Sequence, residues 1–527
     1  MKKLTEKACP AIEIFIIFCF SFYHQNRHTG DKHLLAQVEH TRRTASRLAD
    51  PQQKSRLGQF FTPASIACFM AELFVPNRRK NCILLDAGAG VGSLSAAFLD
   101  RWVDGEFDYK HIELHAFEID ETLHPYLRQT FELYKKKPTI TSTIRSDDFI
   151  IAACDWLENN LFARPLPKYT HAILNPPYKK IRSNSEHRLA LRRVGIETVN
   201  LYSAFVALSL ALLDDHGQLV AIIPRSFCNG LYYRPFREYL LKKAAIRHLH
   251  LFTSRSKAFK DDNVLQENII IHLERGGMQG PVKVSTSTDH SFNDLTVQEH
   301  PFDRIVFVND QERFIHVPTA LNQNIVERCP MVCWSLDDIG LTVSTGPVVD
   351  FRVKAHLREM PGVGTAPLLY PGHFSDSGTE WPKAGKKPNA ILCNSDTKKW
   401  LYPNGFYCLV RRFSSKEEKR RVVASVIEPS LFGDAPLIGI ENHLNVFHEN
   451  RQGLQKVLAY GLAVFLNTTA VDEQFRCFNG HTQVNATDLK TIRYPSRKIL
   501  TVIGEWAIRQ PALTQEKIDN YFETLTT

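Results

Sequence analysis

The chain has 527 residues, of which 23% are charged and 43% hydrophobic, and its formal net charge is +9. This length supplies two or three domains that can each bury a core, and the moderate positive charge suits a polyanionic partner without proving one. The eleven cysteines form no recognisable disulfide framework, and the lone CxxxC pair has no second pair at zinc-finger spacing. We therefore expect no metal site and a reducing, cytoplasmic location.

The N-terminal region begins with lysines and a strongly apolar stretch at residues 14–23, which superficially resembles a secretory signal. The stretch is shorter than the about 20 residues of a membrane span. No small-x-small cleavage site follows it. We expect a buried segment or an over-extended translation start, with residues 1–54 as an N-terminal extension and no membrane association. Residues 31–57 predict one helix.

A glycine loop follows the first predicted strand, which covers residues 83–87. Gly88, Gly90 and Gly92 precede a predicted helix, so the backbone can approach a ligand and free amides at the helix start can bind it. This spacing is a poor match to the G-x-G-x-x-G pattern of dinucleotide folds. Asp86 at the strand end suits a ligand that carries amines and hydroxyls rather than phosphates.

The next two predicted strands also end in acids. Residues 114–118 end in Glu118, which is placed to accept both hydroxyls of a ribose. The third strand leads into Asp147 and Asp148, directly before Phe149. Either acid, together with the phenylalanine ring, could lie near an adenine.

The fourth apolar run, at residues 172–174, ends in Asn175, Pro176, Pro177 and Tyr178. Because the prolines fix the backbone, the Asn175 side-chain oxygen and the Pro176 carbonyl could converge as acceptors, with Tyr178 as a stacking surface. Such a site receives a flat heterocycle with an exocyclic amine. Asn-Pro-Pro is also an ordinary turn after a buried strand, so the tetrad alone leaves both readings open.

Taken together, this series resembles the gamma class of N6-adenine DNA methyltransferases, the S-adenosylmethionine-dependent modification enzymes of type II restriction-modification systems. Residues 58–63, Gly-Gln-Phe-Phe-Thr-Pro, match the first motif of that class, and the likeness extends over about residues 55–275. The class has an acid directly before the phenylalanine, which favours Asp148 over Asp147. The resemblance makes Asn175 to Tyr178 the target-base site. It assigns cofactor contacts to Phe61, Thr62, Pro63, Asp86, Gly88, Gly90, Gly92, Glu118, Asp148 and Phe149.

The mechanism that the resemblance implies is direct methyl transfer, without a covalent enzyme intermediate or a metal. Adenine N6 is a poor nucleophile until acceptors bind both of its hydrogens and free its lone pair. A duplex base would have to be flipped out at a cost of a few kcal/mol, and stacking on Tyr178 offsets about 1 to 3 kcal/mol of it. Phe259 is a candidate second wall, although an aromatic ring in an apolar neighbourhood is more often part of the core.

The predicted fold is α/β, with a Rossmann-like doubly wound methyltransferase sheet in a catalytic domain at residues 55–278. Residues 276–281, which contain three glycines and a proline, are the clearest interruption of secondary structure and mark the domain boundary. Residues 279–527 predict a mixed α/β target-recognition region with short elements at 306–308, 341–343, 390–392 and 406–410. This half loosely resembles modification methylases with long C-terminal halves, including those of the XhoI type.

Several polar and basic residues are candidates for DNA contact, although polar loops are usually only solvated. Lys180 and Arg182 follow the tetrad and could grip phosphates beside a flipped base. Arg411 and Arg412 open the densest basic cluster of the chain. The candidates for base reading are Asn479, Gln483 and Asn485.

Three rival functions share parts of this pattern. RNA and protein-glutamine methyltransferases also bind a planar NH2 group with an Asn-Pro-Pro-Tyr tetrad, but the long C-terminal half favours duplex DNA. A combined restriction-modification enzyme needs a nuclease domain, and few residues precede the first motif. A non-catalytic DNA-binding subunit would not need an intact tetrad. We expect a monomer that acts beside a separate cognate endonuclease.

Overall fold

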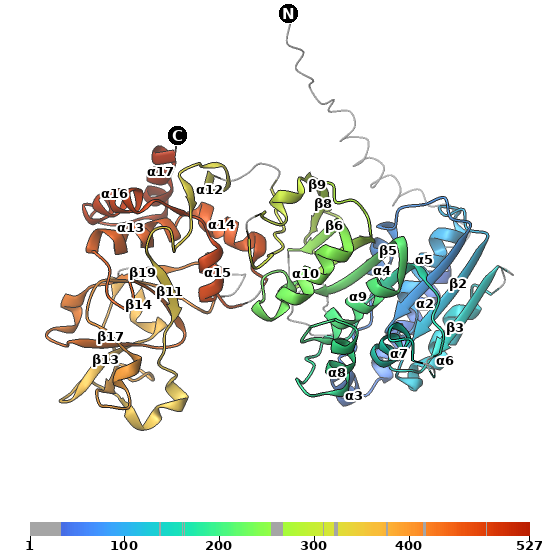
Figure 1. Ribbon diagram of the computed structural model, residues 1–527, viewed down its shortest axis with the longest axis horizontal. Helices are drawn as coiled ribbons and strands as arrows, with labels where there is room; N and C mark the ends of the chain where they lie inside the picture. Colours follow the sequence, from blue (N-terminus) through green and yellow to red (C-terminus); the bar gives the residue numbers. More distant parts are fainter. Residues whose placement is uncertain are drawn as a thin grey trace, which may run out of the picture. The chain divides into compact units, whose positions relative to one another are not determined.

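The computed structural model describes residues 33–135, 139–160, 162, 164–253, 267–308, 310–320, 325–375, 378–414, 418–480 and 482–526 (Figure 1). The chain divides into two compact units. The first unit comprises residues up to 179 together with 208–221, and the second comprises 180–207 and 222–527. The apolar stretch at residues 14–23 lies outside the described residues.

Two helices, not one, lead into the Gly58 motif. Helix α2 (His33–Leu48) ends before Asp50, and α3 (Pro51–Leu57) begins directly after it. Pro51 has no N–H and disfavours helical geometry in the residue before it, while the Asp50 carboxylate accepts from the amides of Gln52 and Gln53 at 3.1 and 3.2 Å. The prediction of a single helix over 31–57 was therefore wrong.

The described part of the first unit contains five strands in the order β3-β2-β1-β4-β5, and each neighbouring pair is parallel. They are β1 (Asn81–Ala87), β2 (His111–Phe117), β3 (Ile140–Arg145), β4 (Tyr169–Leu174) and β5 (Leu213–Pro224). Helices α4 (Ala64–Glu72), α5 (Ser93–Val103), α6 (His124–Glu132) and α7 (Phe149–Leu157) accompany the strands (Figure 1). Helix α9 (Leu201–Leu212), which directly precedes β5, has residues of both units. The predicted α/β class is confirmed.

The chain order of these strands determines where ligands bind. Parallel strands present their carboxyl ends at one edge, and the order reverses between β1 and β4. In open α/β sheets ligands bind at such a reversal. The residues directly after β1, β2, β3 and β4 therefore line one edge of the sheet.

The second unit begins with α8 (Glu186–Arg193) and continues through α10 (Arg234–Lys243) into four strands in the order β7-β6-β8-β9. Strand β6 (Ala244–Phe252) is antiparallel to β7 (Asn268–Arg275) and parallel to β8 (Val282–Ser287), which pairs with β9 (Thr296–His300). Residues 276–281 connect β7 to β8, so the sheet continues past this interruption.

The C-terminal half of the second unit has several small sheets. One has the order β11-β21-β18-β19 and another β12-β16-β13-β20-β17. The short elements predicted at 341–343, 390–392 and 406–410 are β11 (Thr342–Thr345), β16 (Ala390–Leu392) and β18 (Tyr407–Arg411). Residues 306–308 form no strand, because the Val306 amide donates to the Phe302 carbonyl at 2.9 Å and turns the chain.

The remaining strands of these sheets are short. They are β12 (Leu357–Arg358), β13 (Thr365–Leu369), β17 (Leu401–Pro403), β19 (Ala424–Ile427), β20 (Leu437–Ile440) and β21 (Leu444–His448). The described residues after them form helices α13 (Lys456–Leu466), α14 (Thr469–Phe478), α15 (Ala486–Thr491), α16 (Arg497–Ile508) and α17 (Gln515–Thr526).

Helices α13 and α16 cross at two glycines. A Cβ atom on Gly461 would lie 1.8 Å from the Leu500 carbonyl oxygen, and one on Gly504 would lie 1.7 Å from the Val457 carbonyl oxygen. Real Cβ atoms do not approach backbone this closely. The crossing therefore requires glycine at both positions.

Within the described ranges, no helix is long and apolar enough to cross a membrane. The same residues contain no group of three or more His, Cys, Asp or Glu side chains that could hold a metal ion.

Candidate active site

The acidic and amide residues predicted to form the site follow four adjacent strands of the first unit. Asp148 comes after β3, Glu118 after β2, the glycine loop after β1 and Asn175 after β4. The strand order β3-β2-β1-β4 therefore aligns them along the carboxyl edge of the sheet.

Asp86 is fully buried near the end of β1. Its Oδ2 accepts from the Ser95 hydroxyl at 2.5 Å, whereas its Oδ1 has no hydrogen-bond partner among the described residues. Burial raises the pKa of this carboxyl from 3.8 to about 7, the Ser95 hydrogen bond opposes the rise and the nearby Glu118 adds to it. An unpaired buried oxygen of this kind is an acceptor for a ligand donor.

Glu118 holds the glycine loop by hydrogen bonding. The two carboxylate oxygens accept from the backbone amides of Gly90 and Asp120, each at 2.8 Å. Burial raises the pKa of Glu118, and these two hydrogen bonds partly oppose the rise. Gly92 has a φ of +84°, and a Cβ there would lie 2.9 Å from Leu127 Cδ1, so any other residue at this position would be strained.

The two neighbouring acids after β3 have different partners. Asp148 caps α7 by accepting from the Ile150 and Ile151 amides at 2.9 and 3.3 Å. Asp147 forms an ion pair with Arg145 at 3.1 Å. The Phe149 ring is buried and meets the Phe117 ring edge-on, with the centroids 5.1 Å apart.

Asn175 is held by the segment that precedes α4. Its Nδ2 donates to the Phe60 carbonyl at 3.1 Å and to Thr62 Oγ1 at 2.9 Å, and its Oδ1 accepts from the Tyr178 hydroxyl at 3.0 Å. The Phe60 and Tyr178 rings lie 5.2 Å apart and are tilted by 36°. Burial raises the pKa of Tyr178 well above its ordinary value, so the phenol stays protonated and donates.

The Gly58 motif thus contacts both halves of the predicted site. The Gly58 carbonyl accepts from the Tyr178 amide at 3.4 Å. The Phe61 ring is buried, and a Cβ built on Gly90 would lie 3.6 Å from its Cδ1 atom. Pro63 occupies the position before α4. Sequence reasoning missed the link from Thr62 and Phe60 to Asn175, although their place in the motif was the available signal.

The basic candidates after the tetrad belong to the second unit. Lys180 and Arg182 are exposed. Lys180 forms a backbone bridge with Asn200, and the Arg182 carbonyl accepts from Ser185. Phe259 lies outside the described residues.

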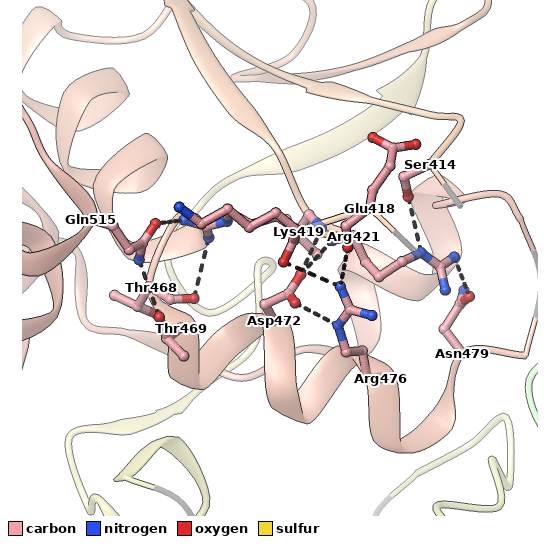
Figure 2. A network of polar contacts seen from close by, with 12 residues as sticks. Ser414, Glu418, Lys419, Arg421, Thr468, Thr469, Asp472, Arg476, Asn479 and Gln515 are labelled. Carbon is pink, nitrogen blue, oxygen red and sulfur yellow. Dashed lines mark hydrogen bonds and ion pairs between the residues drawn. The ribbon is translucent and has the colours of Figure 1, made fainter. Parts of the chain in front are cut away.

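The C-terminal candidates differ in exposure. Asn479 is 1% exposed, and its amide is enclosed by Arg421, Asp488 and the Gln483 carbonyl at 2.8 to 3.1 Å. Gln483 is only partly buried. These contacts place Asn479 in an internal network, which Figure 2 shows beside Arg421.

Asn485 precedes α15, and its backbone N–H donates to Asp488 Oδ2 at 2.9 Å. Arg411 pairs with Glu418 at 2.7 Å. Arg412 donates to the Asn442 carbonyl at 3.2 Å and to Gln483 Oε1 at 3.4 Å. Both arginines are only partly buried and could also reach an outside partner.

Comparison with known proteins decides the family. Residues 128–259 match the model of the Eco57I restriction-modification methylase family. Over 495 residues the chain is 54% identical to the type II methyltransferase M.BsuBI of Bacillus subtilis, covering 93% of this chain and 98% of the relative. The chain belongs to the type II methyltransferases.

A second relative is the type II methyltransferase M.PstI of Providencia stuartii, at 43% identity over 477 residues, which cover 89% of this chain and 92% of the relative. Among solved structures, the DrdV–DNA complex shares the fold at a TM-score of 0.50 and 13% identity, over 95% of this chain and 62% of that one. The predicted family is confirmed, whereas the XhoI-type affinity stays a prediction.

This methyltransferase is therefore a DNA methyltransferase of a restriction-modification system, and S-adenosylmethionine is its cofactor. The residues present fit that cofactor. Asp86 offers an unpaired buried oxygen, and Glu118 adds a second carboxylate at the same edge. Both suit the amine and hydroxyl donors of the cofactor.

Proposed function

We propose that this methyltransferase transfers a methyl group from S-adenosylmethionine to N6 of adenine in duplex DNA. The observation that carries the proposal is the fixed orientation of the Asn175 amide. The Phe60 carbonyl can only accept a hydrogen bond, so Nδ2 of Asn175 must face it. Oδ1 therefore faces Tyr178, where it accepts from the phenol and keeps a second lone pair for an amino hydrogen.

The chain's own residues would position the base. Asn175 Oδ1 and the Pro176 carbonyl accept the two amino hydrogens, which localises the nitrogen lone pair. Pro177 stiffens the turn, and the Tyr178 ring stacks on the flipped base. The methylated amino nitrogen carries an acidic proton that leaves to solvent, so a strong general base is not required.

The cofactor, when bound, supplies an electrophilic methyl group on a sulfonium. We assign its methionine end to Asp86 and to the motif residues Phe61, Thr62 and Pro63, and its ribose to Glu118. The resemblance gives its adenine to Asp148 and Phe149, of which Asp148 also caps α7. The loop of Gly88, Gly90 and Gly92 lets the backbone approach it closely.

We further propose that residues 55–278 form the catalytic domain and 279–527 the target-recognition region. Lys180, Arg182, Arg411 and Arg412 would contact the DNA backbone, and Gln483 with Asn485 would contact bases. A separate endonuclease would share the recognition site, and one copy of the chain holds every residue that the reaction uses.

The test is Asn175→Ala in the full chain, with Asn160→Ala as a control at an exposed position of the first unit. The variant should bind S-adenosylmethionine and DNA as the wild type does, while methyl transfer falls by about 100-fold or more. The control should transfer normally. Unchanged transfer by the Asn175 variant would refute this role, and labelling of RNA or protein in place of DNA would favour the rival methyltransferases.

A further inference from the structure

A small aromatic cluster lies at the surface of the second unit. The Phe413 side chain, two residues after β18, is 43% exposed. Its ring centroid lies 4.9 Å from that of His443, and the two rings are tilted by 39°. The Arg412 guanidinium lies 5.9 Å from the Phe413 ring centroid. An exposed phenylalanine between a cation and an imidazole is a ready surface for a flat partner.

The His443 ring has a fixed orientation. Its Nδ1 lies 2.5 Å from Oε1 of the fully buried Glu441, whose Oε2 accepts from the His443 amide at 2.8 Å. Because Nδ1 is bound to this carboxylate, Nε2 is the ring nitrogen that remains for an outside partner. The imidazole side chain is 44% exposed, so that nitrogen can reach one.

Gln483 lies on the chain segment paired with Phe413. The two residues form an antiparallel bridge, the Ser414 amide donates to the Thr482 carbonyl at 3.1 Å, and the Val484 amide donates to the Arg412 carbonyl at 2.7 Å. Gln483 Oε1 accepts from Arg412 at 3.4 Å. Residues 412–414 and 482–484 therefore form one two-stranded edge that presents Phe413 and Gln483 together.

A buried polar network supports this edge (Figure 2). The Arg421 side chain donates to Ser414 Oγ at 3.0 Å and to Asn479 Oδ1 at 2.8 Å, so it links the first segment of the edge to Asn479. Asp472 of α14 accepts from the Arg421 amide at 2.6 Å. Asn479 in turn donates to the Gln483 carbonyl at 3.1 Å. Residues held this way are pre-organised, as a recognition surface requires.

Buried polar atoms that lack a hydrogen-bond partner among the described residues lie beside the same edge. Nε of Arg411, Nε of Arg412 and Oδ1 of Asn442 are buried and have no hydrogen-bond partner in the described part of the chain. The protein encloses these atoms, so an outside partner meets the edge at the exposed Phe413 and His443 side chains instead.

We propose that Phe413, His443 and Gln483 form the sequence-reading edge of this enzyme on duplex DNA, beside Arg412, whose guanidinium contacts a phosphate. Gln483 would bond a base edge in the groove, and Phe413 would press on the base step beside it. Duplex DNA is the occupant because it is the substrate of the family, and because guanidinium, imidazole, amide and phenyl groups together match phosphates and base edges. The inference deepens the proposed function and rests on it.

The experiment uses the full chain with labelled S-adenosylmethionine and sheared bacterial genomic DNA. Phe413→Ala and Gln483→Ala are compared with Trp334→Ala, an exposed aromatic of matched exposure at 42% in the same unit. Three quantities are measured for each variant: the DNA concentration at half-maximal transfer, the sequence context of the methylated positions, and cofactor affinity.

Phe413→Ala should raise the half-maximal DNA concentration about tenfold, and Gln483→Ala should relax the preference at one base pair by about tenfold or more. Cofactor affinity and the Trp334 variant should match the wild type. Unchanged DNA dependence and unchanged sequence context in both variants would overturn the inference. Phe413→Leu replaces Phe413→Ala if the alanine variant unfolds at a lower temperature than the wild type.

The two proposals fail in different ways. If the wild type methylates a base other than adenine, the proposed function is wrong, but the variants still report on recognition through DNA dependence and sequence context. If the wild type methylates adenine and the variants behave as the wild type does, only the reading edge is wrong.

Discussion

Thr62 and Asn175 are joined by a hydrogen bond of 2.9 Å from Asn175 Nδ2 to Thr62 Oγ1, across 113 residues of sequence. Thr62 belongs to the motif assigned to the cofactor, and Asn175 to the tetrad assigned to the base. One buried contact therefore connects the two predicted sites, and the Phe60 carbonyl beside it fixes which amide atom faces the target.

Thr62→Val keeps the shape of the side chain but removes this acceptor. The Asn175 amide then loses one of its two Nδ2 partners, and we expect methyl transfer to fall about tenfold through the maximal rate. Single-turnover assays with saturating cofactor and DNA measure the effect. Thr62→Ser retains the acceptor and should restore most of the rate. Equal rates in the valine and serine variants would show that the bond does not orient Asn175.

Asp86→Asn tests whether the buried Asp86 carboxyl makes the stability of the protein depend on pH. The pKa is raised from 3.8 to about 7 in the folded protein, so between these values the folded state holds a proton that the unfolded chain has lost. The stability of the cofactor-free protein should therefore fall as pH rises through this window, by up to about 1.4 kcal/mol per pH unit. The asparagine variant should lack this slope. Urea unfolding at pH 5 and pH 7 measures both.

The same substitution, Asp86→Asn, should weaken binding of the cofactor. An amide accepts less strongly than a carboxylate, so we expect affinity for S-adenosylmethionine to fall about tenfold at pH 8 by calorimetry. Asp108→Asn, at a side chain that is 84% exposed, controls for the lost charge. An unchanged affinity in the Asp86 variant would remove this residue from the cofactor site.

Gly461→Ala should destabilise the second unit. The added methyl group would meet the Leu500 carbonyl oxygen at 1.8 Å, so α13 and α16 must separate. We expect a loss of about 3 kcal/mol, at the upper end of the cost of overpacking. Gly385→Ala, where a Cβ has open space, should change little. Thermal unfolding followed by circular dichroism compares them, and equal midpoints would contradict the observed crossing.

Substitutions in the basic cluster should have two kinds of effect, one on stability and one on DNA binding. Arg421 is 1% exposed and bonded inside the network of Figure 2, so Arg421→Ala should lower the free energy of unfolding by about 3 kcal/mol. Arg411→Ala should leave stability within about 0.5 kcal/mol, since its ion pair with Glu418 is exposed. It should instead reduce the slope of log affinity for DNA against log salt by about 1. The reverse assignment of stability and salt effects would contradict the network.

The sheet and the candidate site could be predicted from the sequence because each depends on patterns within short stretches of the chain. At β2 and β4 an apolar run is followed at once by Glu118 and by Asn175, which marks the carboxyl end of a strand as the place of a functional group, and parallel strands bring those ends together. The motif order then supplied the family.

The remaining features depend on contacts distant in sequence. Asn479 and Gln483 look alike in a polar loop, but Arg421, 58 residues earlier, encloses only Asn479. The edge formed by Phe413 and His443 has no motif either, since strand pairing brings its members together. In α2 and α3 the signal was local, as Pro51 marks the break, but helix-favouring neighbours concealed it.

The most direct test of the account is the identity of the methylated nucleoside. The full chain is incubated with labelled S-adenosylmethionine and mixed duplex DNA, which is then digested to nucleosides and separated. We predict that the label is in N6-methyladenosine of the deoxy series. Label in a methylated cytosine, or in no nucleoside while the wild-type protein binds both cofactor and DNA, would contradict the role assigned to Asn175 and Tyr178.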